Sequence, residues 1–137
     1  MTRPQFARDT DAARRTPEAE RRFVTILFAD LSGFTALTET HDPEAVRELI
    51  NACFDLLVPI IEEHQGVVDQ FVGDAIVALF GAPAAHEDDP LQACRAALEM
   101  FDAIEQINAA RNTNLGLHIG INSGMALAGG VGSRGRQ

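Results

Sequence analysis

Two strand-like runs separated by only two residues lie in the middle of this sequence. Residues 67–72 and 75–80 are rich in Val, Ile and Phe, and Gly73 and Asp74 stand between them. A Gly-Asp pair between β-rich runs is a strong signal for a tight hairpin turn. We therefore expect an antiparallel sheet, with Asp74 at the tip of its hairpin.

The segments on either side of this hairpin read as strands and amphipathic helices. Residues 23–29 (FVTILFA) form an apolar run typical of a strand covered on both faces. A short helix is expected up to about Thr40, and Asp42 with Pro43 predicts the start of a long one, which runs to about His64. A second long helix is predicted over residues 89–111. Its expected inward stripe is Cys94, Ala97, Leu98, Phe101, Ile104 and Ile107.

The end of the sequence predicts two more strands. Residues 115–121 alternate strictly between apolar and other side chains, and residues 125–131 are again strand-like, with a turn at 122–124. The predicted order is βααββαββ. This order predicts an α+β fold, in which helices pack on one side of a mostly antiparallel sheet.

Residues 1–22 differ in charge from the remainder and have few large apolar residues. They hold six Arg and four acidic residues, whereas residues 23–137 hold five Arg and sixteen acidic residues. We interpret residues 1–22 as a flexible, Arg-rich leader and residues 23–137 as one domain. A charged stub that touches the domain surface is the alternative interpretation.

Composition excludes several functions. The net charge of −9 disfavours binding to nucleic acid or to an anionic membrane surface, because both require a basic protein surface. All eleven basic residues are Arg, so neither a Walker A loop nor a pyridoxal phosphate site is possible. No signal peptide or membrane span is evident, and two Cys make no disulfide scaffold. We expect a cytoplasmic protein.

Two carboxylates stand out by position. Asp30 ends the first strand and Asp74 occupies the hairpin tip, so both reach one rim of the sheet if the first strand lies antiparallel to residues 75–80. Two converging carboxylates repel unless a cation lies between them, and oxygen ligands suit Mg²⁺ or Mn²⁺. The backbone N–H groups of residues 31–34 follow at a strand–helix junction and suit phosphate oxygens. The alternative is that Asp30 is an ordinary cap after a strand and that Asp74 is an ordinary turn residue.

Three blocks of this sequence resemble the catalytic domain of class III adenylate/guanylate cyclases. They are FADLSGFTALTE (28–39), VDQFVGDAIVALFGAP (68–83) and IGINSGMALAGGVGS (119–133), and the resemblance extends over about residues 22–136. The resemblance implies a ferredoxin-like cyclase fold. It further implies conversion of ATP, or GTP, to a cyclic nucleotide and pyrophosphate with two Mg²⁺ or Mn²⁺ ions. An adenylate cyclase active in intracellular signal transduction is the favoured interpretation.

The resemblance also implies a role for individual residues. Asp30 and Asp74 match the family's two metal-binding aspartates, and the Leu31 carbonyl matches a further metal ligand. Gln70 stands where adenylate-specific members have a base-selecting lysine. The residues that match phosphate-binding positions are Leu31, Ser32, Gly33, Phe34, Thr35 and Arg134.

The resemblance places part of the active site outside these 137 residues. Family members act as dimers, and the partner supplies an asparagine and an arginine from a C-terminal part that has no counterpart here. We therefore expect a fold that is incomplete at its C-terminus, a second cyclase-domain chain as partner, and little activity from this chain alone. The alternative is a degenerate, cyclase-like dimerisation or regulatory module. A phosphoacceptor receiver domain is disfavoured by the missing lysine and the antiparallel hairpin.

Overall fold

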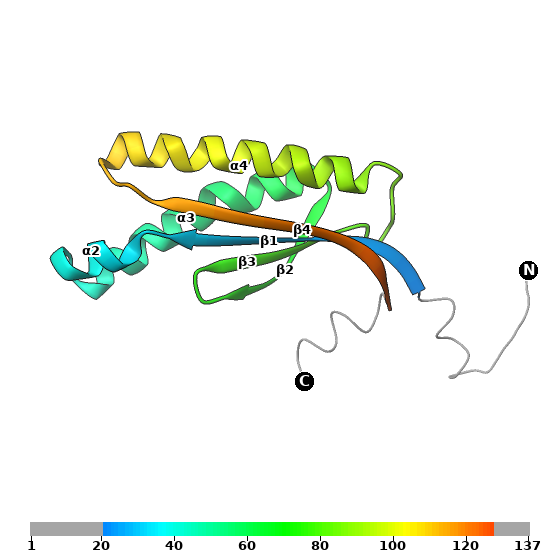
Figure 1. Cartoon of the computed structure of the whole chain (residues 1–137), viewed down its shortest axis with the longest axis horizontal. Coiled ribbons are helices and arrows are strands. Elements are labelled where there is room, and N and C mark those ends of the chain that lie inside the picture. Colours follow the sequence, from blue (N-terminus) through cyan, green and yellow to red (C-terminus); the bar gives the residue numbers. More distant parts are fainter. Residues whose placement is uncertain (1–20, 128–137) are drawn as a thin grey trace, which may run out of the picture.

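The structure, a computed structural model, describes residues 21–127. Within that range a four-stranded sheet lies beneath two long helices, with a short helix at one end (Figure 1). The elements are β1 (Arg21–Ser32), α2 (Phe34–Thr40), α3 (Pro43–Glu63), β2 (Gly66–Val72), β3 (Ala75–Phe80), α4 (Asp89–Arg111) and β4 (Gly116–Leu127).

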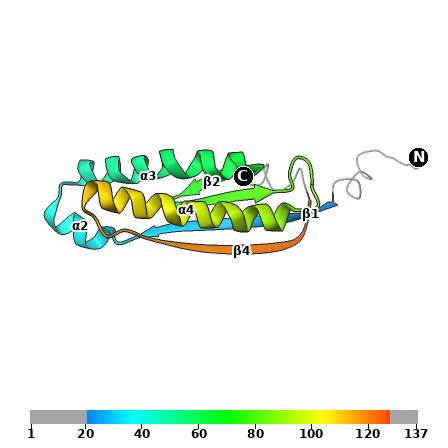
Figure 2. The same ribbon diagram turned by 90° about the horizontal axis from the view of Figure 1, so that it is seen from above.

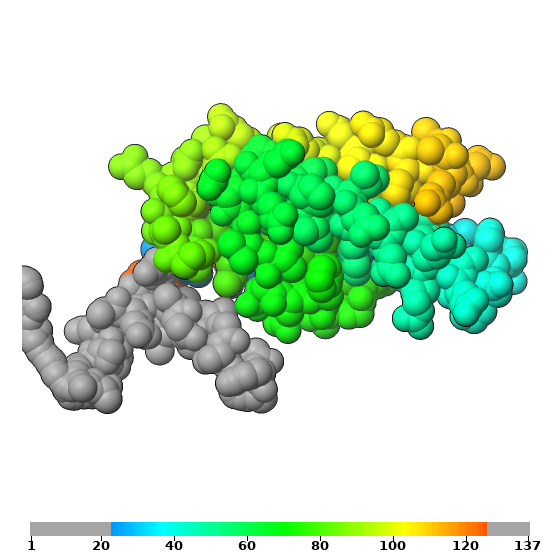
Figure 3. Space-filling model, turned by 180° about the vertical axis from the view of Figure 1, so that it is seen from behind, coloured from blue at the N-terminus to red at the C-terminus, as the bar shows by residue number. Residues whose placement is uncertain are grey.

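The sheet has the strand order β2-β3-β1-β4, and every neighbouring pair is antiparallel. Seen from above, α3 and α4 run alongside each other over one face of the sheet (Figure 2). From behind, α3 and the β2–β3 hairpin form the visible face, with α4 along the top and α2 at one end (Figure 3). The predicted α+β architecture, with helices on one side of an antiparallel sheet, is confirmed.

The hairpin that the Gly-Asp pair predicts is present. β2 and β3 pair antiparallel around Gly73 and Asp74, and Gly73 has a φ of +64°. This left-handed backbone value carries little steric cost for glycine because glycine has no Cβ. The pairing register shifts between Val68 and Gln70, which indicates a bulge in β2.

The two strands predicted after α4 form a single strand in this structure. β4 runs from Gly116 to Leu127 and pairs with the whole of β1, so the turn expected at residues 122–124 does not form. The Thr25 and Ser123 hydroxyl groups also share a 2.8 Å hydrogen bond across this pair. Pairing with a long neighbouring strand therefore outweighs the local turn preference of Asn-Ser-Gly. β1 itself begins at Arg21, two residues before the expected start, and residues 1–20 lie outside the described range.

Helix α3 begins as its sequence predicts. The Asp42 side chain accepts a 2.8 Å hydrogen bond from the Ala45 backbone N–H and caps the helix, and Pro43 occupies its first turn. Its inward stripe is buried in the core between helices and sheet. The buried residues are Val46, Leu49, Cys53, Leu57 and Ile61.

Helix α4 is rotated relative to the prediction. Of the stripe expected inside, Cys94 is exposed, and the exposed fractions of Leu98 and Phe101 are 67% and 40%. Small side chains allow a helix to approach its neighbours closely, and a face rich in Ala packs inward instead. The buried residues of α4 are Asp89, Ala93, Ala96, Ala97, Met100, Ala103, Ile104 and Ile107.

His64, directly after α3, links this helix to α4. Its Nδ1 lies 2.9 Å from Gln92 Oε1 and its Nε2 lies 3.0 Å from Glu99 Oε2. The Gln92 amide nitrogen donates to Asp88 Oδ2, which leaves its oxygen to face the imidazole. Both ring nitrogens can donate only when the ring is protonated. The hydrogen bond to Gln92, with the hydrogen bond and charge of Glu99, raises the pKa of His64, although desolvation opposes the rise.

This link predicts that stability depends on pH through His64. A group whose pKa is raised by folding contributes stability that is complete below the pKa of the unfolded chain, about 6.5 for His, and lost as pH rises through the folded value. We expect the stability advantage of the natural chain over His64→Gln to be largest near about pH 5.5 and to shrink at alkaline pH. Thermal unfolding of both chains over a pH series measures this difference. A pH-independent difference would contradict a charged His64.

Candidate active site

The two predicted metal-binding aspartates meet at one end of the sheet. Asp30 lies opposite Ala75 in the β1–β3 register, and Asp74 directly precedes Ala75. The Leu31 backbone N–H donates to the Asp74 carbonyl oxygen at 3.1 Å, which ties the end of β1 to the hairpin tip. The antiparallel pairing on which the predicted convergence depends is therefore present.

The surroundings of these carboxylates fit a divalent cation. Both residues are half-buried, and within residues 21–127 neither one forms a salt bridge with a basic side chain. The same range contains no cluster of three or more His, Cys, Asp or Glu side chains able to hold a metal. Mg²⁺ commonly binds through one or two carboxylates and completes its shell with water and substrate phosphates. Asp30 and Asp74 are therefore a suitable, open donor set for such an ion.

The Leu31 carbonyl faces the same region. In an antiparallel pair the N–H and C=O groups of one residue point to the same neighbouring strand, and the Leu31 N–H points to Asp74. The Leu31 side chain is 3% exposed and belongs to the core, and its N–H is donated to Asp74, so only the carbonyl oxygen of this residue is available to a ligand.

Gly33 shapes the turn between β1 and α2. Its φ is +93°, and a Cβ at this position would lie 2.9 Å from the Asn114 carbonyl oxygen. No side chain caps α2, and its first turn contains no acidic residue. The N–H groups that begin a helix lack partners within the helix, so those of α2 are free for a ligand such as phosphate.

The other residues of this turn differ in which of their groups are open to a ligand. The Phe34 side chain is buried in the core, so this residue has only its backbone N–H to offer. Ser32 lies opposite Gly116, and its hydroxyl occupies the space above that glycine. Thr35 is exposed. The backbone N–H groups are therefore the main donors that this turn offers to a ligand.

The sheet face without helices in the described range also carries Gln70. The register places Gln70 beside Val77, Val77 beside Phe28, and Phe28 two residues before Asp30. Side chains opposite each other or two residues apart lie on the same face of a sheet. Gln70 is exposed there, two strands away from the Asp30 strand.

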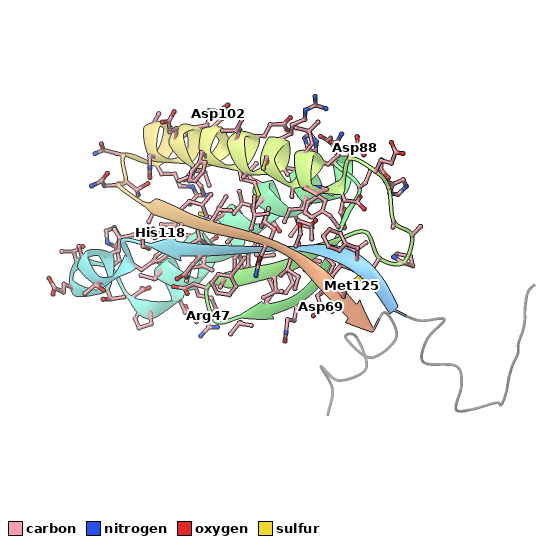
Figure 4. The ribbon with its side chains drawn as sticks, turned by 45° about the vertical axis from the view of Figure 1, so that its right-hand side comes forward. Arg47, Asp69, Asp88, Asp102, His118 and Met125 are labelled. Atoms are coloured by element: carbon pink, nitrogen blue, oxygen red, sulfur yellow. The ribbon has the colours of Figure 1, made fainter. Side chains whose placement is uncertain are left out.

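His118 is a site neighbour that sequence reasoning did not single out. It lies opposite Asp30 in the β1–β4 register, is exposed, and sits near the start of β4 (Figure 4). Directly opposite residues have Cβ atoms about 5 Å apart. The alternation of residues 115–121 already placed His118 on the face opposite Leu117 and Ile119. Only the pairing of β4 with β1 shows that this is the Asp30 face.

Comparison with known proteins identifies the family. The family model for the Adenylate and Guanylate cyclase catalytic domain matches residues 17–137. The chain belongs to this family. Adenylate cyclase 1 of Rhizobium meliloti is 35% identical over 123 residues, which are 86% of this chain and 18% of that protein. The cyclase chain therefore spans less than a quarter of the length of this curated relative.

Solved cyclase structures share the fold. The adenylyl cyclase CyaB from P. aeruginosa has a TM-score of 0.72 at 28% identity, over 77% of this chain and 57% of that chain. The guanylyl cyclase Cya2 has a TM-score of 0.70 at 39% identity, over 77% of this chain and 55% of that chain. The predicted cyclase resemblance is thus confirmed.

Two further findings concern Arg134 and the helices of this chain. Arg134, a predicted phosphate contact, lies outside the residues that the structure describes. Within residues 21–127 no helix combines the length and apolar character needed to cross a membrane.

Proposed function

We propose that this domain forms the metal- and phosphate-binding half of a purine nucleotide cyclase active site, which converts ATP to cyclic AMP and pyrophosphate. The observation that carries the proposal is the hydrogen bond from the Leu31 N–H to the Asp74 carbonyl, which sets Asp74 beside the end of the Asp30 strand. The free N–H groups at the start of α2 follow directly in the chain.

The chemistry assigned to these residues is positioning and charge stabilisation. The Asp30 and Asp74 carboxylates and the Leu31 carbonyl would hold two Mg²⁺ or Mn²⁺ ions. Bound ions of this kind lower the pKa of the ribose 3′-hydroxyl and neutralise the charge that develops on the phosphates. The N–H groups of residues 33–35 would hold phosphate oxygens.

The reaction needs no covalent bond to the protein. The 3′-oxygen attacks the α-phosphorus, the bond from that phosphorus to the bridging β-phosphate oxygen breaks, and the hydroxyl proton passes to water. Pyrophosphate leaves from the side opposite to the attack.

Gln70 is our candidate for contact with the purine. Its amide both donates and accepts hydrogen bonds, so it can pair with the edge of adenine. We favour ATP because the Rhizobium meliloti relative is named an adenylate cyclase. The similarity to the guanylyl cyclase Cya2 makes GTP the second nucleotide to test, alongside ATP.

The proposed partner is a second cyclase-domain chain. The sheet face that carries Asp30 also exposes apolar side chains, among them Ile26, Phe28 and Val72, which are 39%, 43% and 52% exposed. Apolar groups clustered on a surface favour association with another surface. A partner on this face would lie beside Asp30 and Gln70 and would complete the site.

We place the reaction in the cytoplasm. Cys53 and Cys94 are both free thiols, one buried and one exposed, and free thiols are typical of a reducing compartment.

Complementation tests the proposed function. We expect the 137-residue chain alone to form no cyclic nucleotide from Mn²⁺ with ATP or GTP. Mixing it with a complete domain of the family whose own two metal-binding aspartates are replaced by Asn is expected to restore activity. This chain then supplies the metal site and the other domain supplies the rest. Cyclic AMP and cyclic GMP are measured separately to identify the base.

The control is the same mixture with Asp30→Asn in this chain, which is expected to be inactive. Activity that survives Asp30→Asn would contradict the assigned metal site. A heterodimer that forms without any activity would instead support the alternative of a dimerisation or regulatory module.

A further inference from the structure

A narrow apolar stripe runs along the outer side of α4. Leu91, Leu98 and Phe101 are 48%, 67% and 40% exposed, and Cys94 between them is also exposed. The successive spacings are three, four and three residues, which place all four side chains on one line of a helix. Glu105 follows on the same line and ends the stripe.

This stripe has no role in the core or in the proposed active site. The inward face of α4 consists of other residues, mainly Ala, Met100 and Ile104. The Asp30 carboxylate lies on the opposite sheet face from the helices. Clustered apolar side chains on an outer helix face commonly mark an interaction surface.

We propose that this stripe pairs two copies of the chain through antiparallel α4 helices. The three-four-three spacing reads the same in both directions along the helix. A two-fold axis that crosses the stripe at the level of Ala96 therefore superimposes the stripe of one copy on that of the other. Leu91 then meets Phe101 of the second copy, and Cys94 meets Leu98 of the second copy. Alternating spacings of three and four are the pattern by which two helices pack side by side.

Charges beside the stripe favour this antiparallel arrangement. Arg95 and Asp102 are exposed and lie on the same flank of the stripe, and Asp102 is seen on the side of α4 away from the sheet (Figure 4). Antiparallel pairing turns Arg95 of each copy toward Asp102 of the other, with both side chains inclined toward their own helix N-termini. Parallel pairing would place this flank against the opposite flank of the second copy, so Arg95 and Asp102 would not meet. In a chain with a net charge of −9, two such pairs also offset part of the repulsion between copies.

Two paired helices form a small interface. Stable complexes bury about 1,200–2,000 Å² in total, and one helix pair of this length buries less. We therefore expect a weak, concentration-dependent dimer. This pairing uses the helix side of the molecule, so it is independent of the proposed cyclase dimer on the sheet side.

Sedimentation velocity of the full chain over a concentration series tests the pairing. Leu98→Glu is expected to abolish the concentration-dependent dimer without changing the thermal midpoint, because Leu98 is exposed. Gln106→Glu, an exposed position on the same helix but off the stripe, is the matched control and is expected to dimerise normally. Arg95→Glu is expected to weaken the dimer, and Arg95→Glu with Asp102→Arg is expected to restore it.

A cysteine crosslink tests the orientation. Leu98→Cys places a thiol opposite Cys94 of the second copy, so mild oxidation is expected to give a disulfide-linked dimer. Gln106→Cys is expected to give none. A natural chain that stays monomeric at every concentration would overturn the proposal, and so would a dimer that Leu98→Glu leaves unchanged. The latter result would assign self-association to the sheet face instead.

Discussion

Replacing Asp30 or Asp74 with Asn is expected to abolish Mn²⁺ binding by this chain. The two residues lie at one end of the sheet, and no basic side chain within residues 21–127 forms a salt bridge with either. Losing an outer-shell partner of a metal site typically costs about 10–100-fold in affinity, and losing a direct carboxylate ligand costs more. Titration of Mn²⁺ followed by electron paramagnetic resonance measures the affinity of each chain.

Asp69→Asn is the matched control for this experiment. Asp69 lies on β2, which β3 separates from the Asp30 strand, so its replacement removes the same charge without removing a proposed ligand. We expect Asp69→Asn to leave the Mn²⁺ affinity within about twofold of the natural value, since salt screens the attraction of a charge outside the site for the ion. Equal losses in all three variants would show a general effect of charge and contradict a site at Asp30 and Asp74.

Stability in the absence of metal gives a second, independent result. Two neighbouring carboxylates repel each other, so removing one of them relieves that repulsion. Without metal, Asp30→Asn is therefore expected to unfold at the same temperature as the natural chain or at a higher one. A clear decrease would show that Asp30 has a structural role.

Replacing Gly33 with Ala is expected to destabilise the turn that joins β1 to α2. Gly33 has a φ of +93°, and the added methyl group would lie 2.9 Å from the Asn114 carbonyl oxygen and 3.3 Å from the Leu115 Cα. A strained backbone conformation of this kind costs about 1–3 kcal/mol. For a domain of this size, about 2 kcal/mol lowers the thermal midpoint by about 10 °C. Circular dichroism during heating measures the shift.

Gly124→Ala is the matched control for Gly33→Ala. Gly124 lies on β4 at an ordinary φ, and a Cβ there meets no atom within 4 Å. We expect its replacement to change the midpoint by only a few degrees. If both substitutions lowered the midpoint equally, the close contact with Asn114 would not be the cause.

Local pattern was sufficient wherever neighbouring residues specify the structure. The Gly73-Asp74 turn and the Asp42 cap are both properties of a few consecutive residues. Each of these predictions is confirmed.

The predictions that failed concern features that depend on distant partners. The Asn-Ser-Gly sequence at residues 122–124 favours a turn, but β1 is long enough to pair with it throughout. In α4 the larger apolar residues Leu98 and Phe101 suggested the inward face. The Ala-rich face packs inward because small side chains let the helix lie close to the sheet and α3.

The candidate site likewise combines features that local sequence predicts with features that depend on distant partners. The sequence alone singled out Asp30 and Asp74 as candidate metal ligands, because each stands at the end of a strand and within a family motif. Only the tertiary structure decided that the Leu31 N–H joins the hairpin tip, that His118 lies opposite Asp30, and that Gln70 shares their face. The physical reason is that strand order and register bring together residues that are far apart in the chain. Such pairings are set by the sum of many backbone hydrogen bonds and core contacts rather than by any local run of residues.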